Sequence, residues 1–128
     1  MRSKIDRFEE LIAWQKARVL VADIYGATAR DQFNSDPMLK NQMRRAAVSI
    51  LSNIAEGFER GRISEFHQFL SIAKGSCAEL RSQLYVALDA KFLNESHFAR
   101  LQNQAAEVGR ILGGLRSAIQ RKRDLQQA

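Results

Sequence analysis

A sustained seven-residue repeat of apolar side chains near the C-terminus constrains the fold of this chain more than any other feature. Between residues 98 and 119 the apolar positions alternate steps of three and four. The repeat consists of Phe98, Leu101, Ala105, Val108, Leu112, Leu115 and Ile119. Such spacing keeps one face of an α-helix apolar over several turns, as in helices that pack lengthwise against one another. We therefore predict a long helix at about residues 95–121, packed within a helical bundle.

The scarcity of helix-breaking residues extends this prediction to the rest of the chain. Pro37 is the single proline, and of the seven glycines only Gly113 and Gly114 are adjacent. Proline removes a backbone donor and glycine raises the entropic cost of a helix, so their rarity favours long helices. The Gly113–Gly114 pair lies inside the predicted helix, where it is best explained by close approach of a neighbouring helix. The whole chain is expected to be all-α.

Three more apolar seams with helical spacing precede the C-terminal repeat. They predict helices at about 8–29, 37–58 and 64–90. The first seam contains Leu11, Trp14, Ala17, Val21, Ile24 and Thr28. The second contains Leu39, Met43, Ala47, Ile50 and Ile54, and the third Phe66, Phe69, Ala73, Cys77, Leu80, Leu84 and Ala87. Four helices with short connections predict one domain, residues 1–128, folded as an antiparallel up-down-up-down four-helix bundle.

The segments between these seams contain signals for helix ends. Asp36 before Pro37, Ser64 and Asn94 are expected N-caps, since short polar side chains accept hydrogen bonds from the first turn. Gly61 is expected to end the second helix. Residues 30–35 are polar and without period, which indicates a loop. Residues 121–128 lose the apolar period, and we expect this tail to fray.

The apolar stripes are wider than one bundle face requires. The additional apolar positions are Ile12, Leu20, Leu51, Ala55, Ile72, Ile111 and Ala118. Either they widen the core, or one face of the bundle contacts another subunit. The sequence leaves both interpretations open.

The formal net charge of +6 and the isoelectric point near 10.0 favour an anionic partner such as RNA or DNA. Ordinary solubility explains the same surplus. The basic residues near the C-terminus are candidate phosphate contacts or, equally, part of a solvated tail: Arg110, Arg116, Arg121, Lys122 and Arg123. A single cysteine precludes an intramolecular disulfide framework, and the charged N-terminus is unlike a signal peptide. No run approaches the roughly 18 apolar residues of a membrane span. We expect a cytoplasmic protein.

Little in the sequence indicates catalysis or a cofactor. The two histidines follow Glu65 and Glu95 by two residues, a spacing that does not place both side chains on one helix face for a di-metal site. Cys77 occupies a seam position and is expected to be a small core residue. We predict no metal, cofactor or small-molecule substrate. An enzyme using Glu56, Glu79 or Cys77 is the weakest alternative.

A row of polar side chains accompanies the apolar stripe of the second helix. Arg45, Ser49, Asn53 and Glu56 follow one another at steps of four, four and three. Serine and asparagine are mediocre helix formers, so such a row requires a reason. They either form a network that joins helices or subunits, or line a functional groove. We favour the network, because buried polar groups cost little only when they pair.

This row belongs to a recognisable motif. The stretch RRAAVSILSNIAEGFER, followed by SEFHQFLSIAKGSCAELRSQLYVALD, resembles the four-helix-bundle proteins encoded within intervening sequences of bacterial large-subunit ribosomal RNA genes. LIAWQKARVLVADIY and AEVGRILGGLRSAI look like the first and last helices of that family. One departure is Leu51, where the family usually has proline, so a straighter second helix is expected.

The resemblance implies a cytoplasmic, helical, non-enzymatic protein that forms five-subunit rings. A more distant relative, the accessory variability protein of diversity-generating retroelements, is a basic pentamer that binds nucleic acid and a reverse transcriptase. The resemblance also picks out motif positions on this chain: Arg44, Arg45, Ser49, Asn53, Glu56, Gly57, Glu65, Phe69, Ser76 and Glu79. We therefore expect a homopentamer that contacts RNA or DNA; the alternative is a protein–protein scaffold with no nucleic-acid role.

Overall fold

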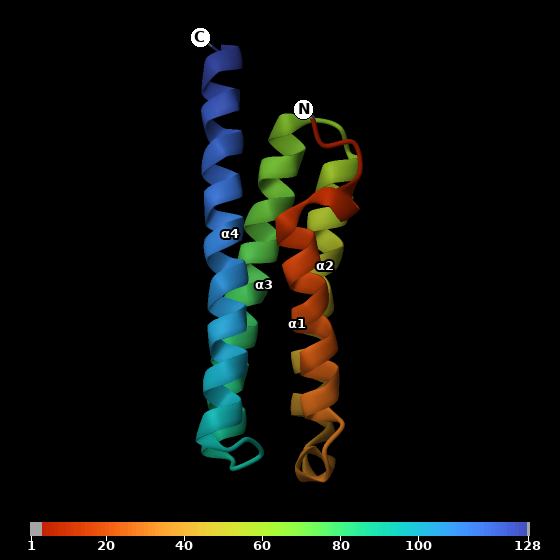
Figure 1. The fold of residues 1–128 in the computed structure, drawn as a ribbon, viewed down its shortest axis with the longest axis vertical. Coiled ribbons are helices and arrows are strands. Elements are labelled where there is room, and N and C mark those ends of the chain that lie inside the picture. Colours follow the sequence, from red (N-terminus) through yellow and green to blue (C-terminus); the bar gives the residue numbers. More distant parts are fainter. Residues whose placement is uncertain (1–3, 128) are drawn as a thin grey trace.

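Four long helices lie side by side and alternate in direction, which confirms the predicted all-α, up-down-up-down four-helix bundle (Figure 1). The computed structural model describes residues 4–127. Its helices are α1 (Ile12–Thr28), α2 (Pro37–Glu59), α3 (Ile63–Asp89) and α4 (Glu95–Gln127). Helix α2 packs against α1 and α3, and α4 packs against α3 and α1. The order of the helices around the bundle thus follows their order in the sequence.

Several helix ends form as the sequence indicates. The carboxylate of Asp36 accepts a hydrogen bond from the Leu39 amide at 3.0 Å, and Pro37 is the first residue of α2. The side chain of Asn94 accepts from the His97 amide at 2.7 Å. Gly61 follows α2 with a φ of +77°, a conformation that favours glycine. The cap predicted at Ser64 is wrong, because α3 begins one residue earlier and has no side-chain cap.

The first predicted helix is divided in two. A short 3₁₀ helix, η1 (Phe8–Glu10), is separated from α1 by Leu11, whose ψ of 127° is extended. The cause is local: the Glu10 carboxylate accepts from the Arg7 amide at 2.9 Å and the Asp6 amide at 3.0 Å. Binding these amides turns the chain before the apolar period of α1 begins. Residues 1–3 of the predicted domain and N-terminal segment, and residue 128 of the tail, lie outside the described residues.

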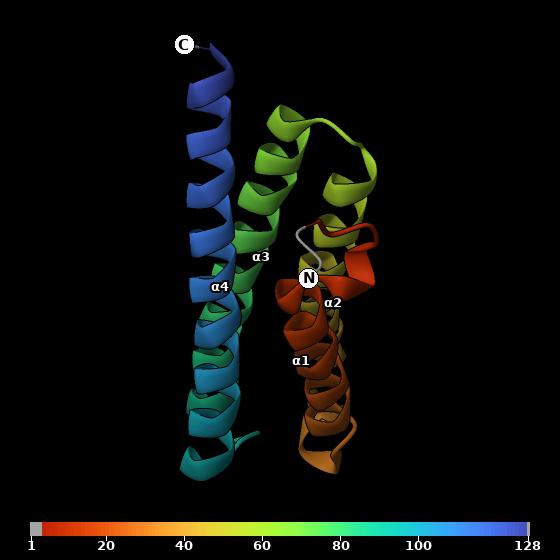
Figure 2. The same cartoon turned by 45° about the horizontal axis from the view of Figure 1, so that its top comes forward.

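Two segments predicted to be irregular are helical. Residues 30–35 contain a second 3₁₀ helix, η2 (Asp31–Ser35), whose Phe33 is fully buried 5.3 Å from the Phe92 ring. The predicted fraying from residue 121 is also wrong, because α4 continues to Gln127 and projects past the neighbouring helix ends (Figure 1 and Figure 2). Gln120 donates to Asp124 one turn later at 2.9 Å, which supports this projecting end.

The core consists of the predicted seams with some shifts. Leu101, Ala105 and Leu112 of the C-terminal repeat are fully buried, as expected. Leu70 is equally buried, although it lies beside the predicted α3 seam and not in it. Among the additional apolar positions Leu20 is buried, whereas Ile12 and Ile72 are 58% and 46% exposed. The wide stripes therefore serve the core at some positions and remain on the surface at others.

Close packing of α2 on α3 depends on Gly57. A Cβ atom at this position would lie 2.5 Å from the Phe69 Cβ and 3.2 Å from the Phe66 ring. The Phe69 Cβ is attached to the α3 backbone, so relief requires the helices to separate. The adjacent glycines of α4 are different: Gly113 faces the Lys74 side chain at 3.5 Å, and Gly114 has open space. The close helix approach expected at Gly113–Gly114 is thus limited to a side-chain contact at Gly113.

Gly57→Ala should destabilise the protein by about 1–3 kcal/mol, because overpacking outweighs the higher helix propensity of alanine. Gly75→Ala is the matched control, since Gly75 lies in α3 and a methyl group at that position would have nothing within 4 Å. That substitution should stabilise by about 0.5–1 kcal/mol. Urea denaturation of both variants measures the difference. Equal stabilisation by the two substitutions would contradict the close contact.

Candidate functional site

The polar row of α2 meets α3 at a small hydrogen-bonded cluster. The hydroxyls of Ser49 and Ser76 lie 2.9 Å apart across the two helices. Asn53 donates from its side-chain amide to the Ser49 carbonyl oxygen at 2.8 Å and to the Ser49 hydroxyl at 3.1 Å. These side chains are half-buried, between the apolar core and the surface. The cluster satisfies its own polar groups and links α2 to α3 at mid-length.

The remaining members of the row lie further out. Glu56 pairs with Arg60 one turn later at 3.1 Å, and both side chains are about half exposed. Arg45 and Glu79 are exposed, and neither forms an ion pair within residues 4–127. The Ser49–Ser76 contact sets an antiparallel register that places Arg45 level with Glu79. The row therefore divides into an internal cluster and a charged outer edge.

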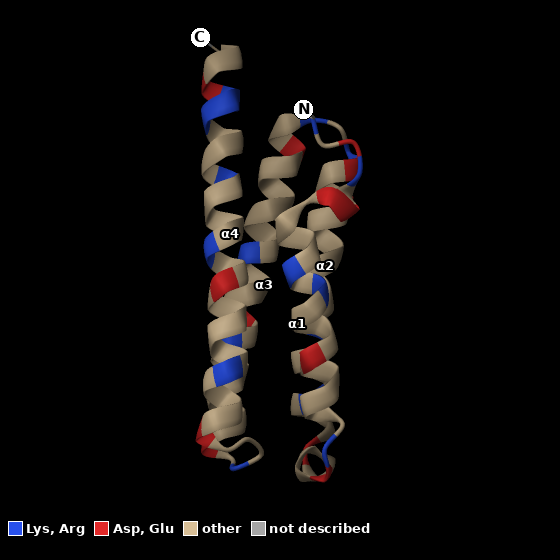
Figure 3. Ribbon diagram, in the orientation of Figure 1, with Lys and Arg blue, Asp and Glu red and all other residues tan. Residues whose placement is uncertain are grey.

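The basic residues near the C-terminus do not converge on one point. Arg116 donates to the Ser71 hydroxyl of α3 at 3.0 Å, and Arg123 donates to Gln120 at 3.4 Å. Arg110, Arg121 and Lys122 are exposed. Figure 3 shows basic residues recurring along α4 to its projecting end. Two of these five side chains, Arg116 and Arg123, are therefore half-buried beside α3, and the other three face solvent.

Sequence reasoning missed a series of polar contacts between α1 and α4. Three α1-side residues spaced seven apart, at 16, 23 and 30, each bind a residue of α4. The contacts are Lys16–Glu107 at 3.4 Å, Asp23–Gln104 at 2.6 Å and Arg30–His97 at 2.7 Å. The sequence does contain a signal for these contacts, because the three polar residues beside the α1 seam are spaced by heptads. Their role is recognisable only once the structure shows that α1 packs against α4.

The Arg30–His97 contact defines the charge state of this histidine. A guanidinium only donates, so the Nδ1 atom of His97 accepts and carries no proton. Burial lowers the pKa of His97, and the nearby guanidinium groups of Arg100 and Arg30 lower it further, against an opposite effect of Asp23. The imidazole is thus held neutral as a link between the end of α1 and the start of α4.

The geometry offers no catalytic constellation among the candidate residues. Cys77 is buried, donates from Sγ to the Ala105 carbonyl oxygen at 3.0 Å, and has its thiol pKa raised chiefly by burial. A protonated, enclosed thiol is a poor nucleophile. Within residues 4–127, His, Cys, Asp and Glu side chains form no group of three that could hold a metal ion. Glu56 and Glu79 are too exposed for a desolvated acid–base role.

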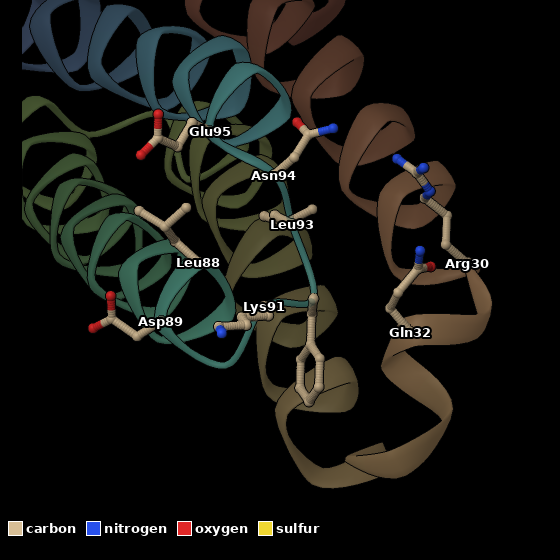
Figure 4. Close-up of a pocket in the computed structure, with 9 residues that line it drawn as sticks. Arg30, Gln32, Leu88, Asp89, Lys91, Leu93, Asn94 and Glu95 are labelled. Atoms are coloured by element: carbon tan, nitrogen blue, oxygen red, sulfur yellow. The ribbon is translucent and has the colours of Figure 1, made fainter.

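A cavity of about 610 Å³ lies at the bundle end formed by the α3–α4 connection (Figure 4). Arg30 and Gln32 line one side of it, and Asp89 and Glu95 lie on the other. Its lining thus carries charges of both signs, and no nucleophile or metal-ligand set accompanies them. This hollow does not indicate a particular ligand. No helix between residues 4 and 127 has the length and hydropathy that crossing a membrane would require.

Comparisons with known proteins agree with the motif. A family model described as 23S rRNA-intervening sequence protein matches residues 9–114. Among solved structures, a protein of unknown function from the S23 ribosomal protein family of Bacteroides thetaiotaomicron VPI-5482 superposes with a TM-score of 0.75. The two chains are 19% identical over 81% of this chain and 97% of that one, which shows a shared fold. A search of curated proteins gave no match.

Ser49→Ala should lower stability by about 1 kcal/mol relative to Ser52→Ala, because it removes the hydroxyl that Ser76 and Asn53 share. Ser52 is an exposed serine of the same helix, so both substitutions change helix propensity equally. Glu56→Gln should change stability by less than about 0.5 kcal/mol, since its ion pair is exposed. Thermal unfolding of the three variants tests this order. A larger loss in Glu56→Gln than in Ser49→Ala would reverse it.

Proposed function

Because the chain belongs to the family of 23S rRNA-intervening sequence proteins, we propose that it is a non-enzymatic bundle that forms a homo-oligomeric ring and contacts RNA or DNA. The ring is proposed to be a homopentamer, and the nucleic acid is bound through basic surface. The compartment that suits both roles is the cytoplasm. Two sets of observations support the two halves of this proposal.

Positive charge without carboxylate partners supports the proposed binding of nucleic acid. The net charge is +6, and the basic residues of the C-terminal half of α4 form no ion pair with a carboxylate within residues 4–127. Arg116 and Arg123 instead have neutral hydrogen-bond partners. Unneutralised cations on a helix surface attract phosphates, and displacing counterions from the nucleic acid drives such binding. This lack of carboxylate partners is the observation that carries the proposal.

The outer face of α2 and α3 supports self-association. Met38, Ile72 and Val86 are 69%, 46% and 50% exposed on these two helices. The exposed Arg45 and Glu79 lie level with one another on the same face. Apolar side chains around opposite charges form a surface that a second copy of the chain can complement. The same face fits the alternative, a scaffold that binds only proteins.

The wild-type protein should bind a fluorescent RNA or DNA duplex measurably at 50 mM salt, with affinity falling steeply towards 300 mM. Replacing Arg121, Lys122 and Arg123 by glutamine in one variant should reduce the magnitude of the slope of log K against log salt by about 2–3. Fluorescence anisotropy measures both. Undetectable binding at 50 mM would leave the protein-scaffold alternative.

A matched triple variant controls for net charge alone. Arg7→Gln, Arg18→Gln and Lys91→Gln together remove the same charge from exposed positions away from the projecting C-terminal end of α4. This variant should keep the wild-type salt dependence. If both triple variants bind like the wild type, the projecting end of α4 is not a contact.

Sedimentation velocity at micromolar concentration should show an assembly of five chains. Ile72→Asp should dissociate it, because a carboxylate would be buried in the subunit contact. Val19→Asp is the control, since Val19 is 53% exposed on α1. A wild-type protein that sediments as a monomer would exclude the ring.

A further inference from the structure

The outer seam between α3 and α4 brings together basic residues of two helices, an alignment that the sequence did not reveal. On α3 they are His67, Lys74 and Arg81, and on α4 they are Arg116 and Arg123. Neighbours within each row are seven residues apart. Seven residues are nearly two helical turns, so each row occupies one helix face with a rise of about 10.5 Å between members. We call these five residues the cationic seam.

Contacts between the helices align three of these side chains, Lys74, Arg81 and Arg116, along the seam. Arg116 donates to Ser71, the residue one turn after His67. Lys74 lies over Gly113, with its Cε 3.5 Å from the position of a Cβ there. Arg81 donates to the Gln102 side chain at 2.9 Å, and Gln102 donates back to the Arg81 carbonyl oxygen at 3.1 Å. Figure 3 shows a basic band on α3 beside one on α4.

No carboxylate of the described chain neutralises the cationic seam. Lys74, Arg81, Arg116 and Arg123 form no ion pair with a carboxylate within residues 4–127. The other seams are different: Lys16 pairs with Glu107 between α1 and α4, and Arg60 pairs with Glu65 near the α2–α3 connection. Along the cationic seam, hydroxyl and amide partners orient the guanidinium groups without cancelling their charge.

His67 lies within the positive field of this seam. Burial lowers the pKa of His67, and the facing guanidinium groups of Arg116 and Arg123 lower it further. At neutral pH the seam therefore presents four cations beside a neutral imidazole. Clustered like charges destabilise the folded chain unless an anion compensates them. A line of cations is complementary to an anion that is itself extended.

The surface of the seam suits a polymer more than a small anion. Its cations recur at intervals of about 10.5 Å along each helix, a distance that a single small anion does not bridge. The seam offers no stacking platform for unpaired bases: α4 has no aromatic residue between 102 and 123, and Phe69, the aromatic residue of α3 between 67 and 81, packs on Gly57.

We propose that the cationic seam binds the phosphate backbone of a nucleic-acid duplex, with one strand lying along α3 and α4. The inference rests on the proposed nucleic-acid function and specifies its contact surface. From His67 to Arg81 the track rises about 21 Å along α3. Recognition is of phosphate and shape, since regularly spaced cations complement the repeating phosphates of a duplex, which carry no sequence information.

The test is a salt titration of duplex binding by fluorescence anisotropy. The four cations of the seam should contribute about −3.6 to the wild-type slope of log K against log salt, in addition to any contribution from Arg121 and Lys122. Lys74→Gln with Arg116→Gln should flatten the slope by about 2 units and weaken binding at low salt by at least about tenfold. Arg7→Gln with Arg18→Gln is the matched control and should leave both unchanged. Lys74→Gln alone should reduce the magnitude of the slope by about 1. Because Lys74 is exposed and this variant keeps the Arg116–Ser71 hydrogen bond, the result does not depend on a loss of helix packing.

The outcomes separate the two proposals. If the wild type binds a duplex but the seam variants keep its affinity and slope, the cationic seam is excluded while nucleic-acid binding stands. If the wild type binds only single strands, the duplex assignment is wrong. If the wild type binds neither form at low salt, the proposed function itself fails. A loss confined to the seam variants supports the inference.

Discussion

The close packing of α2 on α3 is the contact on which the rest of the bundle depends. It requires Gly57, because any side chain there would meet the Cβ atom of Phe69. With the helices at this distance, the Ser49 and Ser76 hydroxyls come within 2.9 Å and Asn53 completes their hydrogen bonding. Steric fit thus determines the separation of α2 and α3, and the polar cluster then favours one register between them.

The seams of the bundle differ mainly in how their charges are compensated. Polar pairs join α1 to α4, and the α2–α3 seam combines an internal cluster with the exposed Arg45 and Glu79 at its edge. The α3–α4 seam has cations with neutral partners. Uniform apolar packing inside thus coexists with three electrostatic surfaces outside. This division assigns separate surfaces to the two halves of the proposed function, because self-association requires complementarity and nucleic-acid binding requires excess positive charge.

Much of the fold was predictable because apolar periodicity reports directly on burial. The C-terminal repeat, the caps at Asp36 and Asn94 and the order of the four helices follow from residue spacing and local hydrogen bonding. The errors occurred where one side chain outweighed the local pattern. Glu10 binds two backbone amides and separates η1 from α1, and Phe33 reaches the core from a segment of polar composition. Asp124 accepts from Gln120 in a tail without apolar period.

The sequence by itself determined that this protein is a helical bundle of the intervening-sequence family, since heptad seams and the motif around Ser49 and Asn53 are local properties of the chain. Only the tertiary structure decided which polar residues meet. Arg81 donates a hydrogen bond to Gln102, and Arg116 donates one to Ser71. The residues of each pair lie on different helices, so the period of a single helix does not predict that they meet. The physical reason is that a helix period gives the face of each residue, whereas the partner of that face depends on how neighbouring helices are rotated and aligned. The presence of cations was therefore readable from residue types, and their continuous line along α3 and α4 was not.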